Sequence, residues 1–187
     1  MWVLDEAICK VSLFVPPGLW VRLGKSVGGF MKIRVLYHDH CFDGAASAAL
    51  FTRFASDRFY NGAEFAYTGM AHKASQLFED HLFDGDENAI VDFKYSNSEK
   101  LTWWFDHHQS AFLSLEDQHD YGLKKAQRRF YFDPTYRSCT EFIAFIARTV
   151  YGYEAPDLAE LVHWAGIIDG AQYKDAAEAV GMREPAM

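Results

Sequence analysis

The sequence has few of the residues and patterns that mark secreted, fibrous or membrane proteins. Its three cysteines, Cys9, Cys41 and Cys139, are scattered and odd in number, so they do not form the framework of a disulfide-rich domain. A reducing cytoplasm is therefore the expected compartment. No apolar run reaches the roughly 18 residues of a membrane-spanning helix, so we expect no contact with a membrane. The sequence also contains no repeat and no low-complexity tract.

Basic residues are also scarce, with 18 Lys and Arg against 26 Asp and Glu, a formal net charge of −8. A chain of this charge is a poor non-specific ligand for duplex nucleic acid, whose phosphates need Lys and Arg contacts. Anionic substrates remain possible, because bound divalent cations reverse the local sign of charge. Apolar residues make up 50% of the 187 residues and aromatic residues 17%, which suits one compact α/β domain.

The first thirty residues differ from the rest of the chain. They contain Pro16 and Pro17, show no strand alternation, and place Asp5 and Glu6 where a secretory signal would be basic. Met31 then begins "MKIRVLYHDH", which is typical of the start of a domain. We predict an extension over residues 1–30 and one domain over residues 31–187, with a packed N-terminal helix or strand as the alternative for the extension.

After Met31, short apolar runs alternate with helical segments. We expect strands over residues 32–37, 63–69, 88–93, 100–105 and 128–133, and helices over residues 42–56, 72–83, 138–153 and 155–172. Alternation of this kind predicts an α/β fold, with a mostly parallel five-stranded sheet and helices on both faces.

Residues that bind metals follow several of these strands. The candidates are His38, Asp39, His40, Cys41 and Asp43 after the first strand, Asp92 after the third, Asp106, His107 and His108 after the fourth, and Asp169 in the last helix. Because sites in parallel sheets form at the carboxyl ends of strands, we expect one shared pocket. Carboxylates with imidazoles favour Mn²⁺, Mg²⁺, Zn²⁺ or Fe²⁺. A carboxylate such as Asp92 can bridge two ions, an arrangement that hydrolyses phosphoesters and phosphoanhydrides.

These residues resemble the DHH phosphoesterases, a family named for the triplet found here as Asp106-His107-His108. The family includes RecJ-type single-strand exonucleases, oligoribonucleases, cyclic-dinucleotide phosphodiesterases, exopolyphosphatases and family II inorganic pyrophosphatases. Four stretches match the family's motifs in order, namely "YHDHCFDGAASAAL", "IVDF", "FDHH" and "GIIDGA". They span residues 37–171, which is nearly the whole chain after Met31.

The resemblance implies a role for each of these residues. Asp92 would bridge two divalent ions, and Mn²⁺ is the expected metal. One ion would be bound by Asp43, His107 and Asp169, and the other by His38. His108 would make a catalytic contact to the scissile phosphate, and Asp106 would orient the histidines.

The first motif departs from the family pattern, since this chain has Cys41 and His40 where members carry a carboxylate. The third ligand of the His38 ion is therefore Cys41, His40 or Asp39. A thiolate ligand would favour Zn²⁺ or Fe²⁺. The alternative for Cys41 is a small buried residue beside the site.

Several other polar residues have simpler explanations. Ser138 and Glu141 have the spacing of a helix capping box, and a phosphate contact is the alternative for them and for Arg137. The basic run over residues 124–129 is expected to be a solvated face, although it could steer an anionic substrate. The remaining histidines are expected to lie away from the site; they are His72, His81, His119 and His163.

The expected function is metal-dependent hydrolysis of a phosphodiester, with metal-activated hydroxide as the nucleophile. The expected partner is a small phosphate-rich substrate or a short single-stranded oligonucleotide, and the oligomeric state is open. One alternative is a weakly active metal- or nucleotide-binding remnant. Members of the family carry a second, C-terminal domain, whereas this chain ends eighteen residues after Asp169. The other alternative is a pyrophosphatase or exopolyphosphatase.

Overall fold

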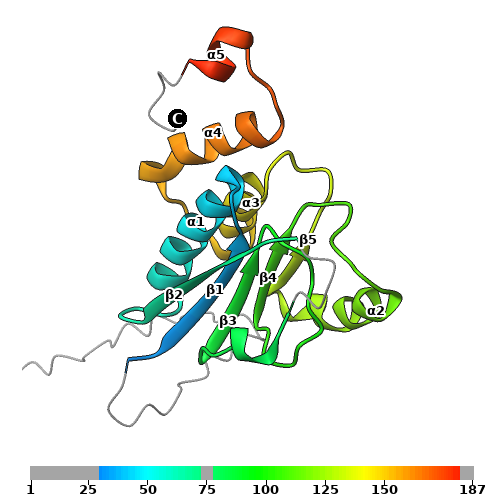
Figure 1. Cartoon of the computed structure of the whole chain (residues 1–187). Coiled ribbons are helices and arrows are strands. Elements are labelled where there is room, and N and C mark those ends of the chain that lie inside the picture. The colour runs from blue at the N-terminus through cyan, green and yellow to red at the C-terminus, as the bar shows by residue number, and fades with distance from the viewer. Residues whose placement is uncertain (1–29, 73–77, 182–187) are drawn as a thin grey trace, which may run out of the picture.

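A five-stranded parallel sheet forms the centre of the molecule (Figure 1). The computed structural model describes residues 30–72 and 78–181. The strands are β1 (Lys32–His38), β2 (Glu64–Met70), β3 (Glu87–Val91), β4 (Trp103–Asp106) and β5 (Phe130–Phe132), in the spatial order β2-β1-β3-β4-β5. Every pair of neighbouring strands is parallel. The predicted α/β fold is therefore confirmed.

The helices are distributed unevenly around this sheet. They are α1 (Phe42–Arg58), α2 (Leu115–Lys124), α3 (Cys139–Tyr151), α4 (Ala159–Asp169) and α5 (Ala176–Val180), with single 3-10 turns η1 (Asp80–Leu82), η2 (Lys125–Gln127) and η3 (Pro156–Leu158). Helices α1 and α3 pack against each other on one face, and α4 packs against both of them (Figure 1). The shorter α2 lies on the other side of the molecule (Figure 1).

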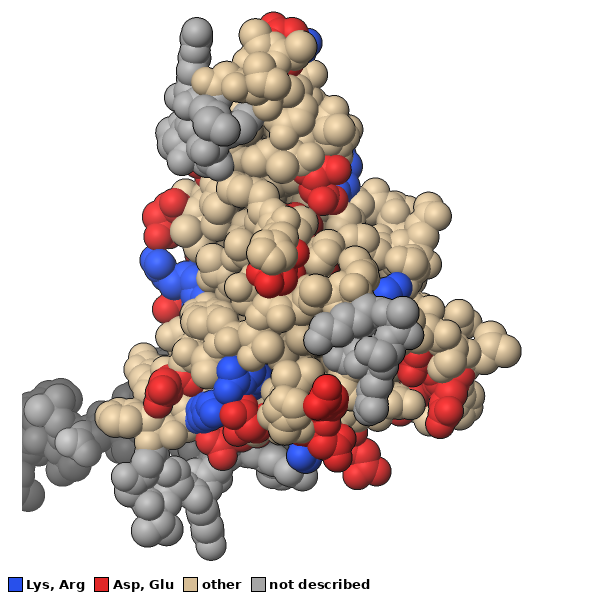
Figure 2. All heavy atoms as spheres, in the orientation of Figure 1, with Lys and Arg blue, Asp and Glu red and all other residues tan. Residues whose placement is uncertain are grey.

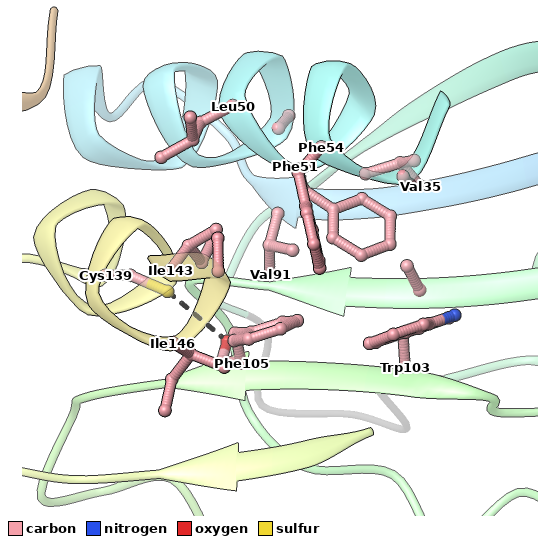
Figure 3. Packing of buried hydrophobic residues seen from close by; sticks show 14 of the residues in the cluster. Val35, Leu50, Phe51, Phe54, Val91, Trp103, Phe105, Cys139, Ile143 and Ile146 are labelled. Carbon is pink, nitrogen blue, oxygen red and sulfur yellow. Dashed lines mark hydrogen bonds between the residues drawn. The ribbon is translucent and has the colours of Figure 1, made fainter. Parts of the chain in front are cut away.

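The larger core lies between the sheet and the pair α1 and α3. Alternate residues of the strands point to this side, and Phe51 and Phe54 of α1 pack over Trp103 and Phe105 of β4 (Figure 3). The Cys139 thiol lies 3.5 Å from the Phe105 carbonyl oxygen, inside this core (Figure 3). The core therefore fixes the start of α3 against the end of β4, where the candidate ligands begin.

A second, smaller core covers the opposite face. Leu36, Ile90 and Trp104 point to this side, where loop residues such as Phe93 and Tyr95 cover them. The buried Trp104 indole donates a hydrogen bond to the Phe93 carbonyl oxygen at 2.9 Å, so the loop after β3 is tied to β4. Loops and α2 thus take the place of the full helical layer that the sequence predicts on this face.

Some predicted elements differ from the structure. The helix expected over residues 72–83 is wrong for residues 78–83, where η1 is the only helical turn, and residues 73–77 lie outside the described part. The helix expected over residues 155–172 is divided, because η3 begins at Pro156 and α4 begins only at Ala159. Helix α2, which the sequence analysis missed, starts with a capping box between Ser114 and Asp117.

Two further predictions concern the N-terminal residues and membrane-spanning helices. The predicted extension over residues 1–30 lies outside the described residues except for Phe30, which is exposed. Across residues 30–72 and 78–181, no helix has both the length and the apolar character needed to cross a membrane.

Charged side chains of both signs are interspersed on the face shown in Figure 2. There the described Lys and Arg residues form small groups among Asp and Glu rather than one continuous basic surface. Two of the four basic residues in the run over residues 124–129 are paired, since Lys124 contacts Asp120 at 2.8 Å and Arg129 contacts Glu87 at 3.1 Å. These pairs reduce the positive charge that the run offers to a polyanion.

The strand order places a topological switch point at the carboxyl ends of β1 and β3. From β1 the chain passes to β2 on one side, and β3 then pairs with the other side of β1. The connections after β1 and β3 consequently diverge, and parallel sheets bind their ligands at such switch points. His38 is the last residue of β1 and Asp92 directly follows β3.

Close packing at this point depends on Gly44. A Cβ atom at this position would overlap the main-chain carbonyl of His38. We expect Gly44→Ala to lower the free energy of unfolding by about 1–3 kcal/mol, as overpacking does elsewhere. The matched control is Gly122→Ala in α2, where a Cβ meets no atom within 4 Å. It should raise stability by about 1 kcal/mol through helix propensity. Urea titration of both variants measures the difference, and equal stabilities would contradict this account of Gly44.

Candidate metal centre

The fold brings the predicted ligands together in overlapping groups around Asp92 and His107. His38, Cys41 and Asp92 form the first group, Asp43, His107 and Asp169 form the second, and Asp92, His107 and His108 form a third that links them. Within each group, one ligand atom per residue lies within 4.8 Å of the others. Their elements are far apart in the sequence: the end of β1, the start of α1, the ends of β3 and β4, and the last residue of α4.

Asp92 lies between two imidazoles that come from different strands. One carboxylate oxygen is 3.5 Å from His38 Nδ1, and the other is 3.4 Å from His107 Nε2. The residue is 1% exposed, and its backbone has a φ of 56°, a conformation uncommon for residues other than glycine. Such backbone strain gathers at functional sites. Each oxygen of Asp92 thus faces an imidazole from a different strand.

The His107 ring directs its Nε2 nitrogen at three carboxylates. Its Nδ1–H donates to the Tyr136 carbonyl oxygen at 3.1 Å, so Nε2 is the ring nitrogen left to bind a cation once its proton is displaced. Nε2 lies 3.4 Å from Asp92, 3.6 Å from Asp43 and 3.5 Å from Asp169. Ligands that sit about 2.1 Å from a metal are roughly 3–3.5 Å apart. This spacing therefore suits a cation at the centre of the group.

Several buried polar atoms here have no hydrogen-bond partner among the described residues. They are His38 Nδ1, both oxygens of Asp92, Asp106 Oδ2 and His107 Nε2. Unpartnered buried polar atoms are costly and rare, because burial removes their bonds to water. Four of these five atoms belong to the two groups around Asp92. Divalent cations would satisfy all four at once.

The electrostatics of the metal-free site also favour a cation. Burial and the neighbouring Asp92 raise the pKa of Asp43 to about 7. Burial also raises the pKa of Asp169. Burial opposes protonation of His107, but its contacts with Asp92 and Tyr136 outweigh this and raise its pKa to about 9. Buried carboxylates at this density hold protons that a metal would displace.

Asp43 has a structural task in addition to its place in the second group. Its carboxylate accepts hydrogen bonds from Cys139 N at 2.6 Å, Thr140 N at 3.0 Å and the Thr140 hydroxyl at 2.6 Å. The aspartate therefore caps the start of α3, where the helix dipole stabilises negative charge. These bonds fix the orientation of its carboxylate beside His107.

Asp106 distinguishes the two neighbouring histidines. One of its oxygens accepts bonds from the main-chain N–H groups of His107 at 2.8 Å and His108 at 3.2 Å, and from His108 Nδ1 at 2.7 Å. His108 Nδ1 is also 3.8 Å from Asp92, but the shorter bond to Asp106 occupies it. The bond to Asp106 therefore takes the Nδ1 that His108 could otherwise offer to an ion, and Nε2 is the ring nitrogen left outside this bond.

The structure also narrows the third ligand on the His38 side. Cys41 joins His38 and Asp92 in one group, whereas neither His40 nor Asp39 does. The His40 side chain is 90% exposed and lies 3.5 Å from Asp39. Burial raises the pKa of the Cys41 thiol to about 11, so a bound cation would be needed to keep it as a thiolate.

His72 belongs to this region, although the sequence analysis placed it away from the site. Its ring centre is 5.0 Å from that of His38, and the ring stacks on Phe93 at 5.1 Å. The signal in the sequence was its position two residues after β2, at the same edge of the sheet as the other candidates. His72 belongs to none of the ligand groups, and its side chain is exposed.

Comparison with known proteins adds no relative for this site. No family model matches the chain, and no curated protein matches it. The assignment of a candidate metal centre accordingly depends on the distances, the burial and the unpartnered atoms around Asp92.

Proposed function

We propose that the protein is a metal-dependent phosphoesterase of the DHH type that hydrolyses a phosphodiester in a nucleotide or short oligonucleotide. The observation that carries this proposal is the Asp92 carboxylate, whose two oxygens face separate ligand groups 3.4 and 3.5 Å away. Two ions sharing one carboxylate are about 3.5–4 Å apart, the spacing that clamps the attacking and leaving oxygens of a phosphate.

The residues present fit two ions. His107, Asp43 and Asp169 would hold one, His38 and Cys41 would hold the other, and Asp92 would join them. Bound there, the ions would supply an activated water and neutralise the charge of the phosphate. Mn²⁺ fits the mixture of carboxylates and imidazoles, and Cys41 adds a preference for Zn²⁺ or Fe²⁺.

His108 would act on the substrate rather than hold an ion, because Asp106 occupies its Nδ1. Its Nδ1–H is fixed by Asp106, a carboxylate with 0% exposure, and its side chain is 34% exposed. The free Nε2 can donate a hydrogen bond to a phosphate oxygen or a proton to the leaving oxygen. Asp106 stabilises the protonated ring and raises the pKa of His108, which favours the donor form.

The surface charge favours a small substrate over a long one. The net charge is −8, and the described basic residues form no continuous surface on the face in Figure 2. Extended contact with nucleic acid phosphates requires such a surface. A short substrate instead needs only the local positive charge that the ions would provide.

The test is hydrolysis with and without metal. Chelated protein should be inactive towards bis-p-nitrophenyl phosphate and a short oligonucleotide, and Mn²⁺ should restore turnover in the wild type but not in His107→Ala. Release of phosphate from pyrophosphate alone would favour a pyrophosphatase. Two tightly bound ions without turnover on any of these substrates would contradict the proposed hydrolysis and favour a binding protein.

A further inference from the structure

Asp169 differs from the other candidate ligands in how it is held. It is the last residue of α4, whereas the others lie at the ends of strands β1, β3 and β4 or at the start of α1. Its side chain is 26% exposed, and its oxygen lies 3.5 Å from His107 Nε2. The position of Asp169 therefore depends on what fixes the C-terminal end of α4.

Arg137 links this end of α4 to the start of α3. Its Nη1 donates to Gln172 Oε1 at 2.6 Å, just beyond α4, and its Nη2 donates to Glu141 Oε1 at 2.7 Å, in the first turn of α3. A planar guanidinium holds two acceptors in a fixed relation, which a lysine cannot do. One side chain thus ties together two helices that are separate in the sequence.

Glu141 in turn meets the backbone of α4. A Cβ atom on Gly166 would overlap the Glu141 carboxylate and lie 2.6 Å from its Cδ atom. Gly166 is three residues before Asp169, so the two share one face of the helix. The contact between α3 and α4 therefore requires both a glycine at position 166 and a carboxylate that Arg137 holds in place.

The residue before Arg137 reaches a second ligand of the same group. The Tyr136 carbonyl oxygen accepts the bond from His107 Nδ1 at 3.1 Å. Residues 136 and 137 thus orient His107 through the main chain and the end of α4 through the side chain. We propose that Arg137 is a positioning residue that, with Glu141 and Gln172, seats Asp169 against His107 for the ion on that side. This inference rests on the proposed metal centre.

The main alternative is a direct contact between Arg137 and a substrate phosphate. Its side chain is 50% exposed, but both terminal nitrogens already donate short bonds to Gln172 and Glu141. The two roles differ in what they change. A phosphate contact affects KM and leaves the binding of metal intact, whereas a positioning role weakens one ion in the absence of any substrate.

Calorimetric titration of the full chain with Mn²⁺ tests the proposal. In Arg137→Ala we expect one of the two ions to bind about 10- to 100-fold more weakly, as when groups that orient metal ligands are removed, and the other to bind unchanged. Asp169→Asn should weaken the same ion. Gly166→Ala should have a similar effect, because its new methyl group would displace the Glu141 carboxylate. The control is Arg148→Ala, which removes an arginine of α3 that makes none of these contacts.

Gln172→Ala removes only the surface contact with Arg137 Nη1. It replaces Arg137→Ala as the test variant if that protein does not fold. It should weaken the same single ion. Unchanged affinity for both ions in Arg137→Ala and Gly166→Ala would overturn the inference, as would an equal loss of both, or a raised KM with both ions retained. If the wild type binds no Mn²⁺, the proposed centre itself fails. If it binds two ions without hydrolysis, only the proposed activity fails, and the titration still tests Arg137.

Discussion

Asp92→Asn should abolish tight binding of both ions and lower phosphodiester turnover by more than about 100-fold, because both proposed ions lose the carboxylate that they share. Each Asp92 oxygen faces a different imidazole, at 3.4 and 3.5 Å. An amide keeps the shape of the side chain but removes its charge and replaces one oxygen. Asparagine also tolerates the left-handed backbone with a φ of 56° that Asp92 adopts, so the fold should persist.

Thermal unfolding with and without Mn²⁺ reports this effect independently of activity. An ion at a hundred times its dissociation constant stabilises a protein by about 2.7 kcal/mol, so Mn²⁺ should raise the melting temperature of the wild type but not of Asp92→Asn. The control is Asp157→Asn, whose carboxylate is exposed and pairs with Arg53. Two ions bound to Asp92→Asn with the affinity of the wild type would contradict the bridging role.

His108→Ala should lower kcat by about 100- to 1,000-fold while both ions remain bound, the usual loss of a proton donor or an oxyanion contact. His107→Ala should instead lose the ion on its side. The two residues are neighbours in the chain, but their rings have different partners, Asp106 for His108 and the Tyr136 carbonyl for His107. Titration with Mn²⁺ and steady-state kinetics on the same preparations separate the two effects.

Substrates with different leaving groups distinguish two roles for His108. If its Nε2 protonates the leaving oxygen, His108→Ala should lose less activity on bis-p-nitrophenyl phosphate, whose leaving group needs no proton, than on a dinucleotide. Equal losses on both substrates would indicate charge stabilisation instead. Loss of a bound ion in His108→Ala would show that His108 is a ligand and would contradict the assignment from its bond to Asp106.

The strands could be predicted from the sequence because their signal is local. Buried parallel strands contain continuous apolar runs, as in residues 89–91 of β3 and residues 103–105 of β4, all of which are buried. Helix α2 was missed because its sequence is polar and interrupted by Gly122, and Leu115 and Leu123 are exposed rather than on a buried stripe. Its only clear signal was the capping box from Ser114 to Asp117.

The capping box predicted at Ser138 is half present. The Ser138 side chain accepts a bond from Glu141 N at 3.1 Å, but the Glu141 carboxylate bonds to Arg137 instead of returning to Ser138. The spacing of a serine and a glutamate cannot show which partner the glutamate takes. That choice depends on α4, which lies against α3 only in the folded chain.

The candidate ligands could be located from the sequence because parallel strands end at one edge of the sheet. The position of each individual side chain could not be predicted in this way. Only the path of the turn decides that Cys41, and not Asp39 or His40, joins the ligand group. In this turn His40 has a φ of 55° and its ring points to solvent. His72 was missed for a similar reason, since its contact with His38 joins the ends of two neighbouring strands.

Anomalous diffraction from crystals grown with Mn²⁺ would show whether two divalent ions share Asp92. We expect two peaks about 3.5–4 Å apart, one beside His38 and the other beside His107, with Asp92 between them. A single peak, peaks away from Asp92, or no peak in crystals saturated with Mn²⁺ would rule out a bridging carboxylate at Asp92.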